Sequence, residues 1–153
     1  MQRRLELLIA LTIVHADTKT PHKRTEMGLD QWCYSCDADE IPNQTVDFPR
    51  PESSVEIAYW RKHPDLHGWM EDLYMKKGGS DPDFNCATVE LTIDDLDNLQ
   101  MAIEDQKLPY TQGFFFGESR GDNEEIQYDL DFVRKAKDLI VNQDKRIFYT
   151  SWW

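Results

Sequence analysis

Residues 27–153 contain four segments in which apolar and polar positions alternate, and this pattern predicts four β-strands. In residues 88–93 the odd positions are apolar and would face a core, whereas the even positions, such as Glu90, are polar and would face water. Aromatic and β-branched residues, which favour extended backbone, are frequent in the other three segments. The predicted strands span residues 27–36, 55–62, 88–93 and 146–153.

Three further segments carry apolar residues at spacings of three and four, which predicts amphipathic helices. The first begins at Pro64, because proline suits the first turn of a helix, and it ends before Gly78. The second follows Thr92, and the third follows Asp122 or Asn123; the side chains of these residues can cap a helix start. We therefore predict a single α+β domain, with a mixed or antiparallel sheet of about four strands and three helices mainly on one face.

Two long connections fit neither the strand period nor the helix period. Residues 37–54 contain three prolines and are predicted to form a loop. Residues 109–121 contain three consecutive phenylalanines, Phe114–Phe116, between two glycines. Aromatic residues in such a loop either enter the core or line a pocket or a partner surface, and both alternatives stay open here.

The chain is acidic, since its 153 residues carry 29 acidic and 17 basic side chains, for a formal net charge of -12. Residues 1–26 hold five basic and three acidic groups, so that segment carries +2 and residues 27–153 carry -14. This charge would repel phosphates, which argues against direct binding to a nucleic-acid backbone. No apolar run is long enough to cross a membrane. The aromatic content of 12% argues against an intrinsically disordered acidic chain.

Residues 1–26 admit two interpretations. Arg3 and Arg4 precede an apolar run, and Ala16 could end a small-residue cleavage site, as in a secretory signal at residues 1–16. The run is short, however, and contains Glu6. These features disfavour a signal, and the alternative is an N-terminal extension, either a mis-called start or an appended segment, upstream of a domain at residues 27–153.

The three cysteines give little support for a metal or a cofactor. Cys33 and Cys36 have the C-x-x-C spacing of some zinc and redox sites, and His63 and His67 could complete a zinc site on paper. Packing as small hydrophobic residues within a strand is the simpler interpretation. We predict neither a metal site nor a cofactor. A phosphate-binding loop is not predicted either, since the loop glycines lack a lysine and are followed by Glu118.

His63 and His67 are candidates for proton transfer, because histidine titrates near neutral pH. They lie four residues apart, on one face of the first predicted helix, but the sequence between them lacks the glutamate of a zinc-protease helix. The structural alternative places His63 at the helix cap and His67 half-buried beside Trp69.

An enzymatic alternative groups polar residues from separate motifs into one pocket. The catalytic candidates are His63, His67 and Cys86, with a histidine as general base and the cysteine as nucleophile. A small enzyme, or a binder of nucleotides or other small molecules, would use a pocket around Arg61, His67, Cys86 and Gln112.

The leading interpretation is a protein that acts by binding another protein. Aromatic residues are over-represented among the interface residues that carry most of the binding energy, and here they occur in the loop and at residues 152–153. The predicted binding residues are Trp60, Arg61, His67, Asn85, Gln112, Phe114, Phe115, Phe116, Glu118 and Trp153.

Six motifs occur in order along residues 27–153, and together they resemble a family of small proteins encoded by bacteriophages and prophages. The resemblance implies that residues 1–26 are an extension and that the protein is of viral origin, but it implies no biochemical role. This origin, the acidic charge, the aromatic residues and the lack of a catalytic motif together lead us to expect an accessory protein in the cytoplasm of an infected or lysogenic bacterium, with a host protein as partner. Some members are labelled phosphoglycerate kinases, which these residues do not support, because such kinases bring two substrates together between two large domains. The motifs are Met27–Gln31, Ile57–His63, Leu66–Met70, Phe84–Cys86, Gln112–Gly117 and Ser151–Trp153.

Overall fold

The computed structural model describes residues 27–153, so the predictions of a signal at 1–16 and of an extension at 1–26 lie outside the described residues. The described elements follow one another in the order β-β-α-β-α-α-β. They are β1 (Asp30–Asp37), β2 (Val55–Arg61), α1 (Pro64–Lys76), β3 (Thr88–Leu91), α2 (Ile93–Glu104), α3 (Asn123–Gln143) and β4 (Lys145–Trp152).

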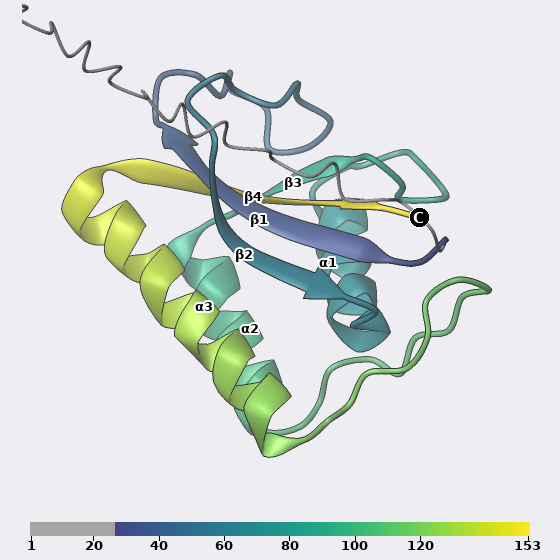
Figure 1. The fold of residues 1–153 in the computed structure, drawn as a ribbon. Helices are drawn as coiled ribbons and strands as arrows, with labels where there is room; N and C mark the ends of the chain where they lie inside the picture. Colours follow the sequence, from purple (N-terminus) through teal and green to yellow (C-terminus); the bar gives the residue numbers. More distant parts are fainter. Residues whose placement is uncertain (1–26) are drawn as a thin grey trace, which may run out of the picture.

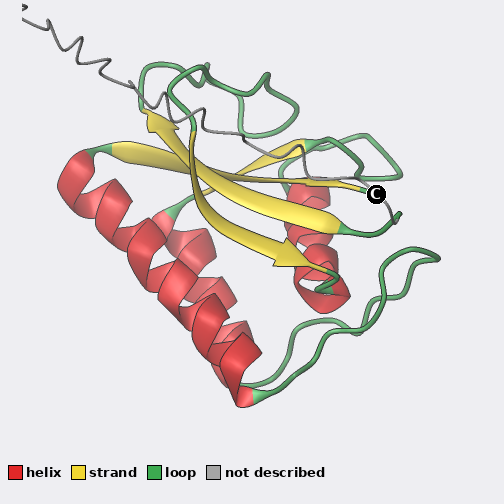
Figure 2. Ribbon diagram, in the orientation of Figure 1, coloured by secondary structure: helices red, strands yellow, loops and turns green. Residues whose placement is uncertain are grey.

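The strands form one antiparallel sheet in the order β2-β1-β4-β3. Gln31 of the inner strand β1, for example, lies opposite Trp60 of β2 and Ser151 of β4. The three helices cover the same face of this sheet (Figures 1 and 2). The predicted α+β class with three helices on one face is confirmed, and of the two predicted sheet types the antiparallel one is present.

The main core fills the space between the sheet and the helices. The inner strands contribute Cys33, Ile147 and Tyr149, which are fully buried there. Cys36 faces the other side of β1 and belongs to a second cluster, so the two cysteines of the C-x-x-C motif pack separately. Burial raises the pKa of the Cys33 thiol well above its usual value. Residues 27–153 contain no group of three or more His, Cys, Asp or Glu side chains placed to hold a metal ion.

Ile41 and Phe48 of the segment 38–54 pack on Tyr34, Cys36 and Phe148, on the face of the sheet opposite the helices. The same segment also pairs with the outer edge of β3. The Asp47 N–H donates to the Thr88 carbonyl at 3.0 Å, and the Glu90 N–H donates to the Thr45 carbonyl at 2.8 Å. These bonds protect an edge strand that would otherwise present unpaired backbone groups. The loop predicted from its prolines is thus packed against the sheet.

The predicted wet face of residues 88–93 is wrong. All four residues of β3 are buried, and the Glu90 carboxylate binds the Arg146 guanidinium at 2.5 and 2.7 Å. The alternating pattern marked the two faces correctly but could not show that residues 38–54 cover the polar one. The strand also ends earlier than predicted, at Leu91, because Ile93 already belongs to α2.

Two of the predicted helix caps are confirmed. The Thr92 hydroxyl accepts the Asp95 N–H at 3.3 Å, and the Asp95 carboxylate accepts the Thr92 N–H at 2.8 Å, which together form a capping box at the start of α2. The Asp122 carboxylate accepts the Glu125 N–H at 2.8 Å at the start of α3. None of the helices within residues 27–153 is long and apolar enough to span a membrane.

Candidate functional site

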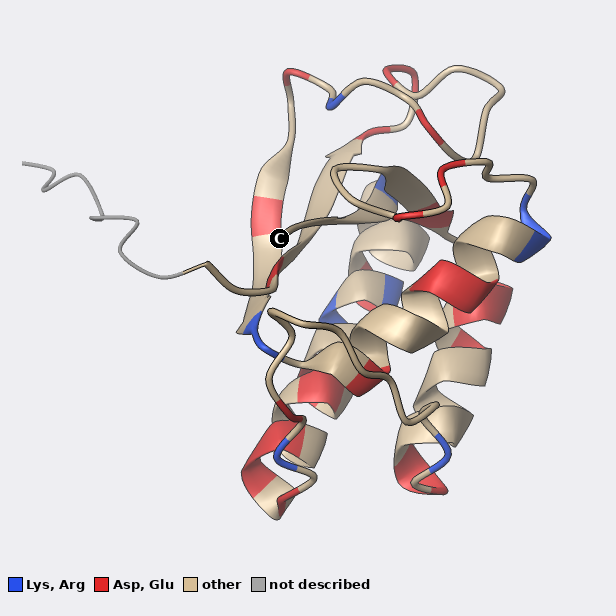
Figure 3. Cartoon of the chain, turned by 90° about the vertical axis from the view of Figure 1, so that its right-hand side faces the viewer, with Lys and Arg blue, Asp and Glu red and all other residues tan. Residues whose placement is uncertain are grey.

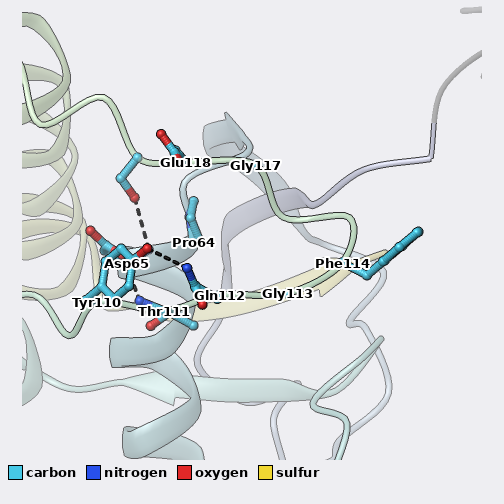
Figure 4. Close-up of a pocket in the computed structure, with 10 residues that line it drawn as sticks. Pro64, Asp65, Tyr110, Thr111, Gln112, Gly113, Phe114, Gly117 and Glu118 are labelled. Carbon is cyan, nitrogen blue, oxygen red and sulfur yellow. Dashed lines mark hydrogen bonds between the residues drawn. The ribbon is translucent and has the colours of Figure 1, made fainter.

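Residues 105–122 form a long loop between α2 and α3 (Figure 1), and the Phe116 ring of this loop packs edge-on against Trp153, just after β4. Its three phenylalanines differ in exposure. Phe116 is 7% exposed and packs edge-on against His67. Phe114 is 94% exposed and points away from the other labelled residues of the loop (Figure 4). Phe115 is half-buried and packs against Phe114.

Two glycines allow this loop to fold back tightly. A side chain at Gly113 would meet the Phe116 ring at 2.5 Å, so a larger residue would displace the buried phenylalanine. Gly117 has φ +69°, in the left-handed region that favours glycine. The exposed position of Phe114 therefore belongs to a defined turn, which the Phe116 N–H closes by donating to the Gly113 carbonyl at 3.1 Å.

An open hollow of about 770 Å³ lies beside the loop (Figure 4). The Asp65 carboxylate accepts the Thr111 N–H at 3.0 Å, which ties the loop to α1. Neither Asp65 nor Glu118 forms an ion pair with a basic side chain of residues 27–153. The hollow thus combines aromatic rings with acidic groups, and its lining includes Asp65, Tyr110, Gln112, Phe114 and Glu118.

Ser119 connects this loop to a buried polar cluster. Its hydroxyl oxygen accepts the Asp65 N–H at 3.0 Å and lies 2.8 Å from Nδ1 of His63. The loop is therefore fixed on the carboxyl side of Phe114 by Phe116 in the core and by Ser119 at the start of α1, and on its amino side by the Thr111–Asp65 hydrogen bond.

His63 lies just before α1, where we predicted a cap, but its side chain does not cap the helix. Its Nε2 lies 2.9 Å from Oδ2 of Asp129, whose Oδ1 accepts the Trp60 indole N–H at 2.8 Å. An ionised carboxylate only accepts hydrogen bonds, so Nε2 carries the proton. In the neutral ring, Nδ1 then accepts the Ser119 hydroxyl proton. Ser119, His63 and Asp129 thus form a hydrogen-bonded relay across three segments of the chain.

Gln31 of β1 holds the backbone of His63 in place. Its side-chain amide donates to the His63 carbonyl at 3.1 Å and accepts the His63 N–H at 3.0 Å. Gln31 is fully buried, and these bonds satisfy its amide group within the core. The ring of His63 is therefore fixed through its main chain as well as through its two nitrogens.

A second hollow, of about 200 Å³, opens beside the relay. Glu125 lies at its wall, with Oε1 3.8 Å from Nδ1 of His63 and Oε2 accepting the Gly121 N–H at 2.6 Å. One side of the hollow is apolar, since Ile103, Leu108 and Ile126 line it. Polar and apolar walls therefore meet next to the Ser119 hydroxyl.

His67 differs from the prediction of a half-buried neighbour of Trp69. It is fully within the core, where its Nδ1 lies 2.8 Å from the Tyr149 hydroxyl and its ring stacks on Phe84. Burial lowers the pKa of His67 to about 4, because the charged ring would be desolvated. His67 is a neutral core residue at neutral pH.

The remaining predicted residues lie in separate places. The Asn85 side-chain amide forms two hydrogen bonds with the main chain of Trp153. It donates to the Trp153 carbonyl at 2.7 Å and accepts the Trp153 N–H at 3.1 Å. Cys86 is exposed and lines a different hollow from Gln112. Arg61 pairs with Asp30 at 2.9 Å. The structure does not bring Arg61, His67, Cys86 and Gln112 together in one pocket.

Sequence reasoning missed three residues of the polar cluster, Ser119, Glu125 and Asp129. One signal was present for Asp129, because it lies between Ile126 and Val133 on the apolar face of α3. An acidic residue on a buried face needs a partner. No comparable signal marked Ser119, whose partners come from distant segments.

Comparison of the chain with protein families, with curated proteins and with solved structures finds no match.

Proposed function

We propose that this chain is a small acidic accessory protein of bacteriophage origin that acts in the bacterial cytoplasm by binding a host protein. The observation that carries the proposal is Phe114, which is 94% exposed on a turn closed by the hydrogen bond from the Phe116 N–H to the Gly113 carbonyl. A large exposed aromatic residue can enter a partner's pocket and supply much of the binding energy. The viral origin rests on the resemblance of the ordered motifs described above, and the host partner is inferred from that origin.

The proposed surface is smaller than the set of residues predicted from the sequence. Trp60, His67 and Phe116 are buried, so they support the surface rather than contact a partner. The proposed contact residues are the predicted loop residues that are exposed in the structure. Tyr110 of the same loop, which was not predicted from the sequence, is added to them. They are Tyr110, Gln112, Phe114 and Glu118.

Charge indicates what kind of partner this surface fits. Residues 27–153 carry -14, and Asp65 and Glu118 in the hollow have no cationic partner within that range. Figure 3 shows acidic positions spread over the loops and helices on the side of the molecule that carries the loop. A partner complementary to this surface has an apolar pocket for the Phe114 side chain, with lysine or arginine side chains around that pocket.

Photo-crosslinking tests this proposal. We would place p-benzoyl-phenylalanine at position 114, and in a control protein at position 141, where Val141 is also largely exposed, at 70%. After irradiation in lysate of a bacterial host, we expect one predominant adduct from position 114, absent from position 141 and weakened by high salt. Equal patterns from the two positions would contradict a binding surface at this loop.

A further inference from the structure

We propose that the Ser119–His63–Asp129 relay is a catalytic site that hydrolyses small esters whose acyl group is uncharged or cationic. The inference is independent of protein binding through Phe114, since it concerns the second hollow and the buried cluster behind it. Its basis is the juxtaposition of a nucleophile, a base and an orienting carboxylate at the wall of an accessible hollow.

The three side chains have the geometry that a hydrolytic relay needs. Oγ of Ser119 lies 2.8 Å from Nδ1 of His63, and Nε2 of His63 lies 2.9 Å from Oδ2 of Asp129. Both distances are within hydrogen-bond reach, and the neutral ring with its proton on Nε2 leaves Nδ1 free to accept the serine proton. The ring is turned relative to serine proteases, in which Nε2 rather than Nδ1 faces the serine.

The base is held rigidly, which favours proton transfer without reorganisation. Asp129 uses one oxygen for His63 and the other for the Trp60 indole, and it is 2% exposed. Gln31 fixes the His63 backbone through both of its polar groups. Preorganised groups of this kind are the usual support of catalytic side chains.

The surroundings of Ser119 define the substrate class. The hollow of about 200 Å³ is smaller than the pocket of a drug-sized ligand, and its apolar wall suits a short acyl chain. Asp65 and Glu125 on its polar side would repel an anionic substrate. An uncharged or cationic ester of a short-chain acid fits both properties.

The reaction proceeds in two halves. Ser119 Oγ attacks the ester carbonyl carbon while its proton passes to Nδ1 of His63, and the imidazolium is stabilised by Asp129 and by Glu125, 3.8 Å away. The bond to the leaving alcohol then breaks, and that alcohol takes the proton from Nδ1. Water attacks the acyl-serine next, gives its proton to Nδ1, and the acid leaves as the proton returns to Ser119. The Asp65 N–H at the amino end of α1 donates to Oγ and stabilises the negative charge that develops on this oxygen when the bond to the acyl group breaks.

A fluorophosphonate probe tests the proposal directly, because it forms a stable adduct with an activated serine. We expect a single adduct that maps by mass spectrometry to Ser119, and faster hydrolysis of p-nitrophenyl butyrate than of p-nitrophenyl palmitate. The Ser119→Ala variant should abolish both signals, while His63→Gln should slow labelling by about a hundredfold. Ser53→Ala, a change at a serine outside the relay, serves as the matched control and should behave as the wild type.

Circular dichroism and thermal unfolding of each variant separate lost chemistry from lost fold. Absence of the adduct on Ser119 in folded wild-type protein at excess probe would overturn the proposal. So would equal labelling of wild type and a folded His63→Gln variant. Neither result bears on crosslinking from position 114, so the two proposals fail separately.

Discussion

His63 and His67 lie one helical turn apart at the start of α1, and both are almost completely buried, at 3% and 1% exposure. Their surroundings are opposite in character. His63 lies among Asp129, Glu125 and the Ser119 hydroxyl, whereas His67 is bonded to the neutral Tyr149 hydroxyl and enclosed by aromatic rings. Burial alone thus does not decide what a histidine can do, because the neighbouring segments supply the chemistry.

The loop 105–122 contacts both histidines and so joins the two environments. Phe116 packs edge-on against His67, and Ser119 lies within hydrogen-bond distance of His63. The exposed residues Tyr110, Gln112 and Phe114 precede both anchors, and only Gly117 and Glu118 lie between them. A change at one anchor therefore tests packing, and a change at the other tests the polar cluster.

The largest effect is expected from Asp129→Ala. This substitution leaves Nε2 of His63 and the Trp60 indole without their acceptor inside the protein, and each buried donor left without a partner costs about 1–3 kcal/mol. Urea unfolding monitored by tryptophan fluorescence measures the loss. Asp138→Ala, at an exposed position of the same helix, is the control and should leave the urea midpoint of unfolding nearly unchanged. Similar losses of stability in both variants would contradict a stabilising role for the hydrogen bonds of Asp129.

A pH-dependent loss of stability is expected from His67. The unfolded chain protonates this histidine near pH 6.5, whereas the folded chain resists protonation until pH about 4. The free energy of unfolding should therefore fall as the pH drops from 6.5 to 4, by about 3 kcal/mol from this group alone.

Comparison with His67→Gln isolates this contribution, because glutamine does not titrate and the carboxylates are common to both proteins. The difference in unfolding free energy between wild type and variant should shrink as the pH falls through the window. A constant difference would show that His67 is not held neutral by burial.

A smaller effect is expected from Tyr149→Phe. Removing the hydroxyl leaves Nδ1 of His67 without its partner at 2.8 Å in a fully buried site, which costs about 1–3 kcal/mol. Thermal unfolding gives the comparison with Tyr128→Phe, whose hydroxyl bonds to the main chain of Tyr59 at a partly exposed position. Equal losses of stability in the two variants would show that the buried Tyr149–His67 hydrogen bond contributes no more to stability than the partly exposed Tyr128–Tyr59 bond.

The smallest effect on stability is expected from Phe114→Ala. Its side chain is almost fully exposed, and substitutions at such positions change stability by about 0.5 kcal/mol or less. Phe116→Ala, two residues away, should lower the melting temperature clearly, because it leaves a cavity beside His67. A large loss from Phe114→Ala would mean that this residue serves the fold rather than a partner.

The sequence patterns predicted the elements well and the environments poorly. The period of two and the spacings of three and four located the strands and helices, and Thr92 and Asp122 marked two helix starts. The burial of Glu90 depends on residues 38–54 and on Arg146 of the neighbouring strand, which no local pattern places beside it. Local periodicity reports which face is apolar, but not what covers the polar one.

The candidate site shows the same limit. His63 and His67 were recognised as chemically interesting, yet nothing within their own motif separates them. The partners that do so, Ser119, Asp129 and Tyr149, are 56, 66 and 82 residues away from the histidine that each contacts.

Nitrogen-15 NMR of the two imidazole rings at neutral pH tests the central distinction most directly. In the neutral ring of His63 we predict the proton on Nε2 and an unprotonated Nδ1 that accepts from Ser119. We also predict that His67 stays neutral down to pH about 4. A neutral His63 ring with its proton on Nδ1, or titration of His67 near 6.5, would contradict these predictions.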